Sequence, residues 1–314
     1  MGRNEILKVF LRDKIILTPE ALKLLEENED IIERVRKRCL EEGIGLLDSR
    51  FIEEELSKKR LEINIEKPEE VKEFGIEDLI SMLKKRFEFL SPLVVQNNQI
   101  KDVFSISKIE KGRNKFQKGV IIGLVKDKTN YTFTLEDLSG CLVVHGEIGD
   151  IDKLNIDEVV GVEVYREEER FKAQRFFYPS FTFFRKIEKV NYEVVIESNN
   201  LVVEDKKIEI NVDKGVRVNI GSIEVFVLNF DFLKYYFRDK PLENLILLLE
   251  KRHLNPTIIK DKELYKEDFF LLKEIPEYII VINSPIQERR IYKGVQIYFL
   301  GKNSKVSLKD GKVS

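Results

Sequence analysis

The apolar pattern of this 314-residue chain changes period near Val94, and this change constrains the fold more than any other feature. Before that point, apolar residues recur at helical spacing. After it, apolar and polar residues alternate over short runs such as 131–135, which reads Tyr-Thr-Phe-Thr-Leu. Alternation places every second side chain on one face of a strand. We therefore predict an α+β fold, with a helical N-terminal region followed by sheets.

Residues 1–92 are predicted to be helical. Thr18 can cap a helix that begins at Pro19, where the missing N–H of proline costs nothing. A last helix is expected over 76–90 and is expected to end before Pro92. Its buried side is predicted to consist of Leu79, Ile80, Leu83, Phe87 and Leu90.

Charge is plentiful but balanced. The chain has 54 basic and 56 acidic residues, a net charge of −2 and 35% charged residues. This balance argues against nucleic-acid binding through bulk positive charge. The basic clusters at 58–60 and 84–86 are accordingly expected on solvated helix faces. Abundant Lys and Glu, with only two Cys and two Met, are typical of a protein from a thermophile.

Five short strands separated by turn signals favour a small closed β-barrel or a sandwich over 93–190. They are expected at 116–124, 131–135, 141–144, 159–165 and 171–178. Because alternate residues of a barrel strand share a face, one set should point inward. That set is Val120, Ile122, Leu124, Phe133, Leu135, Val144, Val160 and Val162.

The remaining residues, 191–314, alternate short strands with one long helix that begins near Pro241. This order indicates a layered α/β domain. Cys39 and Cys141 are too few for a disulfide framework or a cysteine zinc site. No stretch approaches the roughly 18 apolar residues of a membrane span, and the N-terminus lacks the pattern of a signal peptide. We expect a soluble, cytoplasmic protein with no membrane partner.

Two stretches resemble the small subunit of archaeal family D DNA polymerase. The segments 119–125, 135–140 and 157–162 resemble the OB-fold of that family. The segment 248–256 reads Leu-Leu-Glu-Lys-Arg-His-Leu-Asn-Pro and resembles the family's helix that ends in Arg-His-Leu-Ala-Pro. Two further matches follow in family order, at 274–277 and 291–295.

The resemblance implies an OB-fold followed by a calcineurin-like phosphoesterase domain. In active members that domain is a 3′–5′ exonuclease with two metal ions, held by Asp, His and Asn ligands at fixed spacings. This chain has Asn229 and Asn283 where the family has ligand histidines, and the region of the first ligand motifs is too short. We expect a truncated, inactivated remnant that is not an enzyme and holds no metal or other cofactor.

Neither of the two histidines is expected to be catalytic. His145 precedes Glu147 and Asp150, a group that could hold a metal but reads more simply as a polar turn. His253 is expected to pack at a helix end, where an imidazolium would favour the negative end of the helix dipole.

The main candidate contact site is the aromatic segment 176–184, which reads Phe-Phe-Tyr-Pro-Ser-Phe-Thr-Phe-Phe. Two interpretations stay open. The segment forms a hydrophobic seam to the next domain or to a partner, or it stacks the bases of single-stranded DNA. The candidate contact residues are Arg175, Phe176, Phe177, Tyr178, Phe181, Phe183, Phe184 and Arg185.

Three regions are thus predicted: helices over 1–92, an OB-fold over 93–190 and a degenerate phosphoesterase-like domain over 191–314. The expected function is that of a non-catalytic accessory or scaffold subunit in archaeal DNA replication or repair. Its expected partner is a replication protein, in particular a DNA polymerase catalytic subunit. A single-stranded nucleic-acid-binding OB-fold protein is the alternative. Loss of half of a two-sheet sandwich is also expected to leave apolar sheet surface uncovered, which would mark a binding site.

Overall fold

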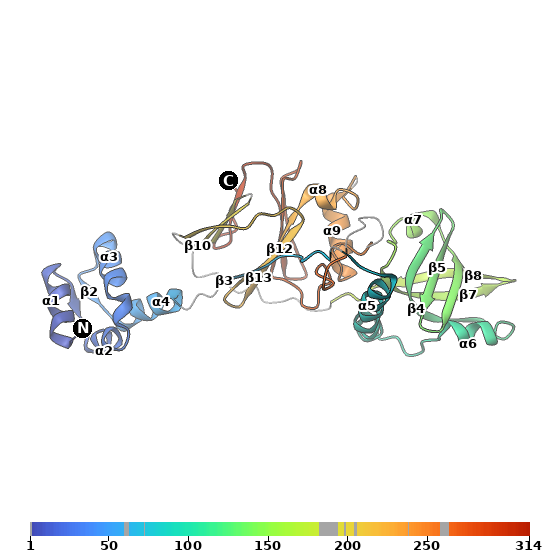
Figure 1. Cartoon of the computed structure of the whole chain (residues 1–314), viewed down its shortest axis with the longest axis horizontal. Coiled ribbons are helices and arrows are strands. Elements are labelled where there is room, and N and C mark those ends of the chain that lie inside the picture. The colour runs from blue at the N-terminus through green and yellow to red at the C-terminus, as the bar shows by residue number, and fades with distance from the viewer. Residues whose placement is uncertain are drawn as a thin grey trace. The chain divides into compact units, whose positions relative to one another are not determined.

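A computed structural model describes the chain except residues 1, 60–62, 72, 182–193, 198, 204–205, 238 and 258–263 (Figure 1). The side chains of residues 30 and 57–59 are also outside the description. The chain is an α+β protein that divides into two compact units. The first consists of residues 1–64 with 219–222, and the second contains the rest.

The first unit is a small helical domain, as its apolar spacing predicts. Thr18 caps the second helix, with its Oγ1 accepting from the Ala21 N–H at 3.2 Å. A pair of two-residue parallel strands, which the helical periodicity does not predict, joins the loops. Its elements are α1 (Arg3–Arg12), β1 (Ile16–Leu17), α2 (Pro19–Glu27), α3 (Ile32–Glu42), β2 (Leu46–Leu47) and α4 (Ser49–Lys59).

Helix α5 (Ile76–Asn97) belongs to the second unit, so the predicted boundary at 92 falls inside a helix. Pro92 does not end it. Pro92 lies on the exposed side of α5, so the carbonyl that it leaves without a donor faces solvent. The predicted buried face is also displaced, because Ile80 is 58% exposed whereas Arg86 and Val94 are buried.

Five strands that follow α5 form a closed barrel in the order β4-β5-β6-β8-β7. The pair β6 and β8 is parallel and the other four pairs are antiparallel. The strands are β4 (Lys118–Lys128), β5 (Thr132–Asp137), β6 (Gly140–His145), β7 (Val159–Glu167) and β8 (Arg170–Phe177). The short helices α6 (Ile106–Lys111) and α7 (Ile148–Ile151) accompany them.

The barrel core confirms five of the predicted inward residues, namely Phe133, Leu135, Val144, Val160 and Val162. The prediction for β4 is wrong by one residue. Ile121 and Val125 point inward, and the predicted residues pack outside the barrel against α5. Because β4 is apolar on both faces, alternation could not decide which face was inside. The misassigned residues are Val120, Ile122 and Leu124.

The rest of the chain forms two further sheets, called here the α/β domain together with α8 (Phe230–Leu233) and α9 (Pro241–Glu250). Their orders are β15-β16-β14-β13-β12-β3 and β11-β10-β9-β17. The strands β13, β14 and β16 run parallel. The bounds are β3 (Ile63–Glu66), β9 (Val194–Glu197), β10 (Asn200–Val203), β11 (Lys206–Glu209), β12 (Gly215–Ile220), β13 (Ile223–Asn229), β14 (Tyr278–Ile282), β15 (Glu288–Tyr292), β16 (Val295–Phe299) and β17 (Lys305–Ser307).

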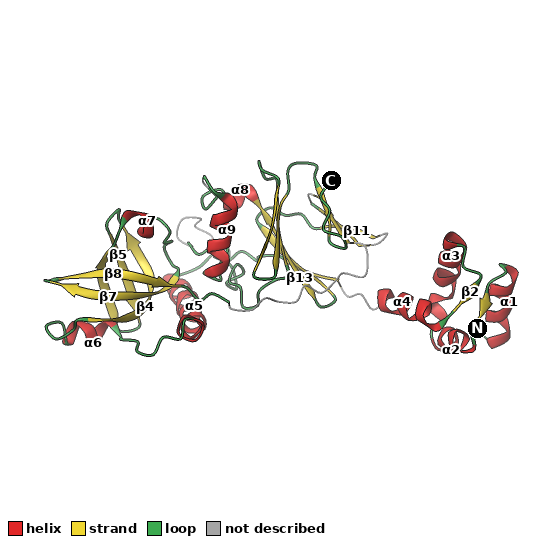
Figure 2. Ribbon diagram, turned by 180° about the vertical axis from the view of Figure 1, so that it is seen from behind, coloured by secondary structure: helices red, strands yellow, loops and turns green. Residues whose placement is uncertain are grey.

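The central strands are covered on both faces, so the predicted uncovered apolar surface is wrong. Every residue of β14 and β16 is buried. One face packs against Leu245 and Leu249 of α9. On the other face the C-terminal turn approaches so closely that a Cβ on Gly311 would lie 2.9 Å from the Tyr298 hydroxyl oxygen. In Figure 2, α9 and the smaller sheet lie on opposite sides of β13. Among the described residues, no helix combines the length and apolar character needed to cross a membrane.

Candidate functional site

The described part of the aromatic segment packs into the interior of the second unit. Phe176 joins the barrel core, with its ring centroid 5.6 Å from that of Phe133. Phe177, which is 8% exposed, packs with the residues between α5 and the barrel. Phe181, which is 4% exposed, belongs to the core of the α/β domain. The segment therefore passes from one core to the other.

The described rings of this segment expose little surface on which a base could stack. Tyr178 is half-buried, and burial raises the pKa of its hydroxyl. Arg175 is exposed, but its guanidinium lies 4.9 Å from the centroid of the Phe177 ring. These contacts are those of a seam between domains, and base stacking by the described rings would require them to leave their cores. Phe183, Phe184 and Arg185 lie outside the described residues.

Asn229 and Asn283, the positions at which the resembled family has ligands, stand at the carboxyl edge of the parallel strands. Asn229 ends β13 opposite Ile282 of β14, and Asn283 follows directly. The Asn229 Oδ1 accepts from the Asp231 N–H, and its Nδ2 donates to the Val212 carbonyl, both at 3.0 Å. This amide thus caps α8 and fixes a neighbouring loop.

Asn283 has a conformational role. Its φ of 57° is in the left-handed region, which Asn tolerates better than most residues. It leads into Ser284, whose Oγ accepts from the Ile286 N–H at 3.1 Å. Within the described ranges, no three His, Cys, Asp or Glu side chains are grouped so as to hold a metal ion.

A cluster of charged and polar side chains lies between α5, the barrel and the α/β domain, away from the carboxyl edge of the parallel strands. Five side chains form what we call the ionic seam: Arg86, Glu158, Lys251, His253 and Asp268. Arg86 has no exposed side-chain surface. Its guanidinium donates to both carboxylate oxygens of Asp268, at 2.7 and 3.0 Å, and to the carbonyls of Asp157 and Pro256, at 2.7 and 2.6 Å. The expectation that the cluster 84–86 is solvated is therefore wrong for Arg86.

His253 packs in the interior just after α9, as predicted, but its hydrogen bonds are those of a neutral ring and not of an imidazolium. Its Nδ1 accepts from the Asn255 N–H at 3.1 Å, so the ring proton is on Nε2, which donates to Asp268 at 2.8 Å. Burial, and then the nearby charge of Arg86, lower the pKa of His253 to about 4. Burial alone would raise the pKa of Asp268, but Arg86 and His253 outweigh it and hold that pKa below its usual value.

A second buried ion pair lies in the same seam. The Lys251 Nζ is 2.7 Å from the Glu158 Oε2, and both side chains are at most 1% exposed. Lys251 also donates to the Lys153 carbonyl, and its Nζ lies 5.3 Å from the centroid of the Tyr178 ring. Burial lowers the pKa of Lys251 although Glu158 acts against it. Glu158 accepts a further bond from Asn155 at 3.0 Å.

Sequence reasoning missed the ionic seam for identifiable reasons. Arg86 lies four and eight residues before Leu90 and Val94, which places it on the face that packs against the barrel. That spacing predicts a buried position for Arg86, whereas the neighbouring Lys84 and Lys85 suggest a solvated face. Asp268 offered no signal, because its partner Arg86 is 182 residues away in the chain.

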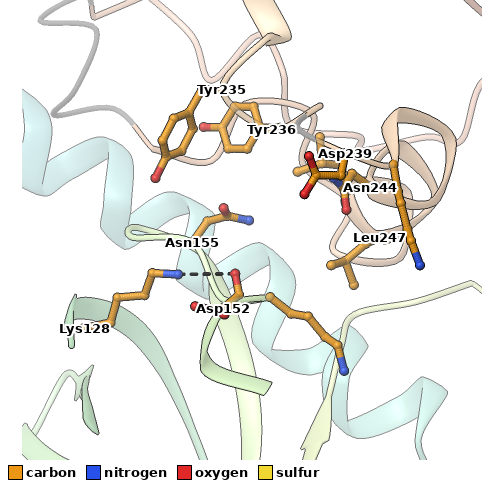
Figure 3. A pocket seen from close by; sticks show the side chains of 11 residues that line it. Lys128, Asp152, Asn155, Tyr235, Tyr236, Asp239, Asn244 and Leu247 are labelled. Carbon is orange, nitrogen blue, oxygen red and sulfur yellow. Dashed lines mark hydrogen bonds between the residues drawn. The ribbon is translucent and has the colours of Figure 1, made fainter. Parts of the chain in front are cut away.

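A cleft of about 430 Å³ opens beside the seam, between the barrel loops and the segment that precedes α9 (Figure 3). Lys128 on its wall donates to the carbonyls of Ile151 and Leu154, at 3.1 and 2.5 Å. On the opposite wall, the Tyr236 hydroxyl donates to the Asn255 Oδ1 at 2.8 Å. The remaining lining consists of tyrosine, amide, lysine, aspartate and leucine side chains.

Comparison with known proteins adds little. No protein-family model and no curated protein matches the chain. A solved structure of the hypothetical protein ygiW from E. coli aligns at 10% identity, over 24% of this chain and 88% of that chain. Its TM-score of 0.19 is too low to support an argument.

Proposed function

We propose that this chain is a non-catalytic accessory subunit in archaeal DNA replication or repair, and that it works by holding a protein partner. The observation that carries the proposal is the location of 251–256, part of the stretch that most resembles the family D polymerase small subunit. This stretch supplies Lys251 and His253 to the ionic seam and a carbonyl to Arg86. The resemblance therefore falls on the joint between two domains, which is where a scaffold needs its specificity.

The barrel supports the same proposal. Its closed strand order and its single parallel pair, β6 with β8, support the proposal of an OB-fold. The resemblance implies an OB-fold at this place in the chain. On this proposal the α/β domain is the phosphoesterase remnant, and Asn229 at the end of β13 and Asn283 directly after β14 mark its former ligand edge.

Binding without catalysis is supported by the roles of these two asparagines. Asn229 uses both atoms of its amide on backbone groups, and Asn283 sustains a left-handed turn. An imidazole at either position would have to replace these structural contacts. We infer that selection for metal ligands no longer acts on this edge, and that the chain is not an enzyme.

The partner that the resemblance favours is a DNA polymerase catalytic subunit. Because the central sheet is covered, contact through bare strands is not part of the proposal. The exposed surface of the barrel and the cleft of Figure 3 remain for the partner. Arg175 is the exposed member of the candidate contact residues among those described.

The test is reconstitution of the purified chain with a purified catalytic subunit of an archaeal family D polymerase. We expect a stable complex on gel filtration, weakened by Arg175→Glu if the edge of the aromatic segment contributes. Labelled single-stranded DNA should bind weakly across a salt series. Absence of the complex, together with tight single-strand binding that falls steeply with salt, would reject the proposal in favour of a nucleic-acid-binding OB-fold.

A further inference from the structure

The first half of α5 carries an apolar stripe that stays largely exposed among the described residues of the second unit. Ile76 is 77% exposed and Ile80 is 58% exposed, and Leu83 and Phe87 continue the line at half-buried positions. The steps of four, three and four residues match the alternating core positions of a coiled-coil heptad. After Phe87 the same steps reach the buried residues Leu90 and Val94, which pack against the barrel. The apolar face of α5 that packs against the barrel therefore continues past the barrel, towards the start of the helix.

A mostly apolar groove adjoins the end of this stripe. It has a volume of about 430 Å³ and lies between α5, the loop that precedes α6 and the turn between β5 and β6. Leu138, at 70% exposed, and Val103, at 43% exposed, stand on its walls with Phe87 and Pro92. Exposed apolar surface that continues from a helix face into a groove is typical of an interaction site.

The charges beside the stripe indicate the occupant. Glu77 and Lys84 are seven residues apart, so they lie on the same flank of the stripe. Suppose that a second α5 lies antiparallel, with Ile76 opposite Phe87 and Ile80 opposite Leu83. Each Glu77 then lies beside Lys84 of the other copy, and the pair occurs twice by symmetry.

The apolar side of the alignment is also self-consistent. Each exposed isoleucine meets a larger or equal apolar side chain of the second copy, in the pairing of core positions that antiparallel coiled coils use.

We propose that this protein self-associates through α5, as an antiparallel pair with a second copy of the chain. The pairing would bury the stripe 76–87 and seal the groove. It concerns a different surface from the ionic seam and does not depend on which partner the barrel or the α/β domain binds.

The test is sedimentation velocity of the full chain over a wide concentration range. We expect a monomer–dimer equilibrium that Ile80→Asp abolishes without loss of circular dichroism. Lys84→Glu should weaken the dimer by roughly tenfold, since both cross-pairs become like-charged. Glu77→Lys added to Lys84→Glu should restore it, because the pairs are then reversed and opposite again.

The matched control is Lys101→Glu, which changes the same charge at an exposed position outside the stripe and should leave the equilibrium unchanged. A wild-type chain that stays monomeric at the highest concentration would overturn the proposal. So would a dimer that Lys84→Glu does not weaken, or that the double charge reversal does not restore.

Discussion

The ionic seam and the carboxyl edge of the parallel sheet use polar side chains in opposite ways. The seam buries five ionisable groups, including a Lys251–Glu158 pair at 2.7 Å with at most 1% exposure. The edge carries the amides of Asn229 and Asn283, which serve backbone capping and turn formation. Buried charge is costly unless every partner is present, so it specifies one arrangement of the groups that hold it. The contrast indicates that the buried charged side chains of the ionic seam join the barrel to the α/β domain.

The largest expected effect comes from breaking the centre of the seam. Asp268→Ala leaves the buried Arg86 without its carboxylate, and loss of one partner from a buried pair costs about 3–5 kcal/mol. We expect urea unfolding to show a loss of this size, because Arg86 cannot reach solvent.

The matched control is Asp310→Ala. Asp310 is an exposed carboxylate that pairs with Lys312 at 3.0 Å and accepts from the Lys312 N–H at 3.1 Å, so its loss should lower the unfolding midpoint far less than loss of Asp268. If Asp268→Ala were as mild as this control, the seam would not join the domains as described.

The second prediction separates the cost of breaking the Lys251–Glu158 ion pair from the cost of replacing it with apolar side chains. Lys251→Met should destabilise the protein by about 3 kcal/mol, because the carboxylate of Glu158 then stays buried without its cation. Adding Glu158→Leu should recover much of that loss, since two apolar side chains can replace a buried ion pair at little cost. A double-mutant cycle by urea unfolding measures the coupling. Simple addition of the two single losses would show that the pair is not coupled.

The third effect depends on pH and separates His253 from the permanent charges. The pKa of His253 is lowered to about 4 in the folded chain, below its ordinary value of 6.5. Its contribution to stability is thus complete above pH 6.5 and is lost as pH falls towards 4, because the unfolded chain takes up the proton first. The loss amounts to about 3 kcal/mol at most.

His253→Gln can still donate to Asp268 but does not titrate. Urea unfolding between pH 4 and 7 should therefore show a shallower dependence on pH for this variant than for the wild type. Equal slopes in the two proteins would mean that folding does not lower the pKa of His253.

The sequence predicted elements better than faces. Alternation located the barrel strands, and Thr18 correctly marked a helix start. The alternation pattern did not assign the faces of β4, because Ile121 and Ile122 are both buried and no polar residue marks the face that points away from the barrel core. The expectation for Arg86 was wrong because its charge and neighbouring lysines suggest an exposed residue, whereas its spacing from Leu90 and Val94 places it on the buried face of α5. Coverage of the central sheet could not be predicted, since the close approach of Gly311 to Tyr298 is a property of the folded C-terminus.

Absence of catalysis is tested most directly by hydrolysis of 3′-labelled single-stranded DNA and of bis(p-nitrophenyl) phosphate, with manganese, magnesium or no added metal. We predict no turnover above buffer for the wild type, and none for Asn229→Ala, which should lose the cap of α8 and the hydrogen bond to the Val212 carbonyl, each worth about 1 kcal/mol. Metal-dependent turnover that survives purification and disappears on substitution of Asn229, Asn283 or His253 would contradict the proposal that this chain acts by binding alone.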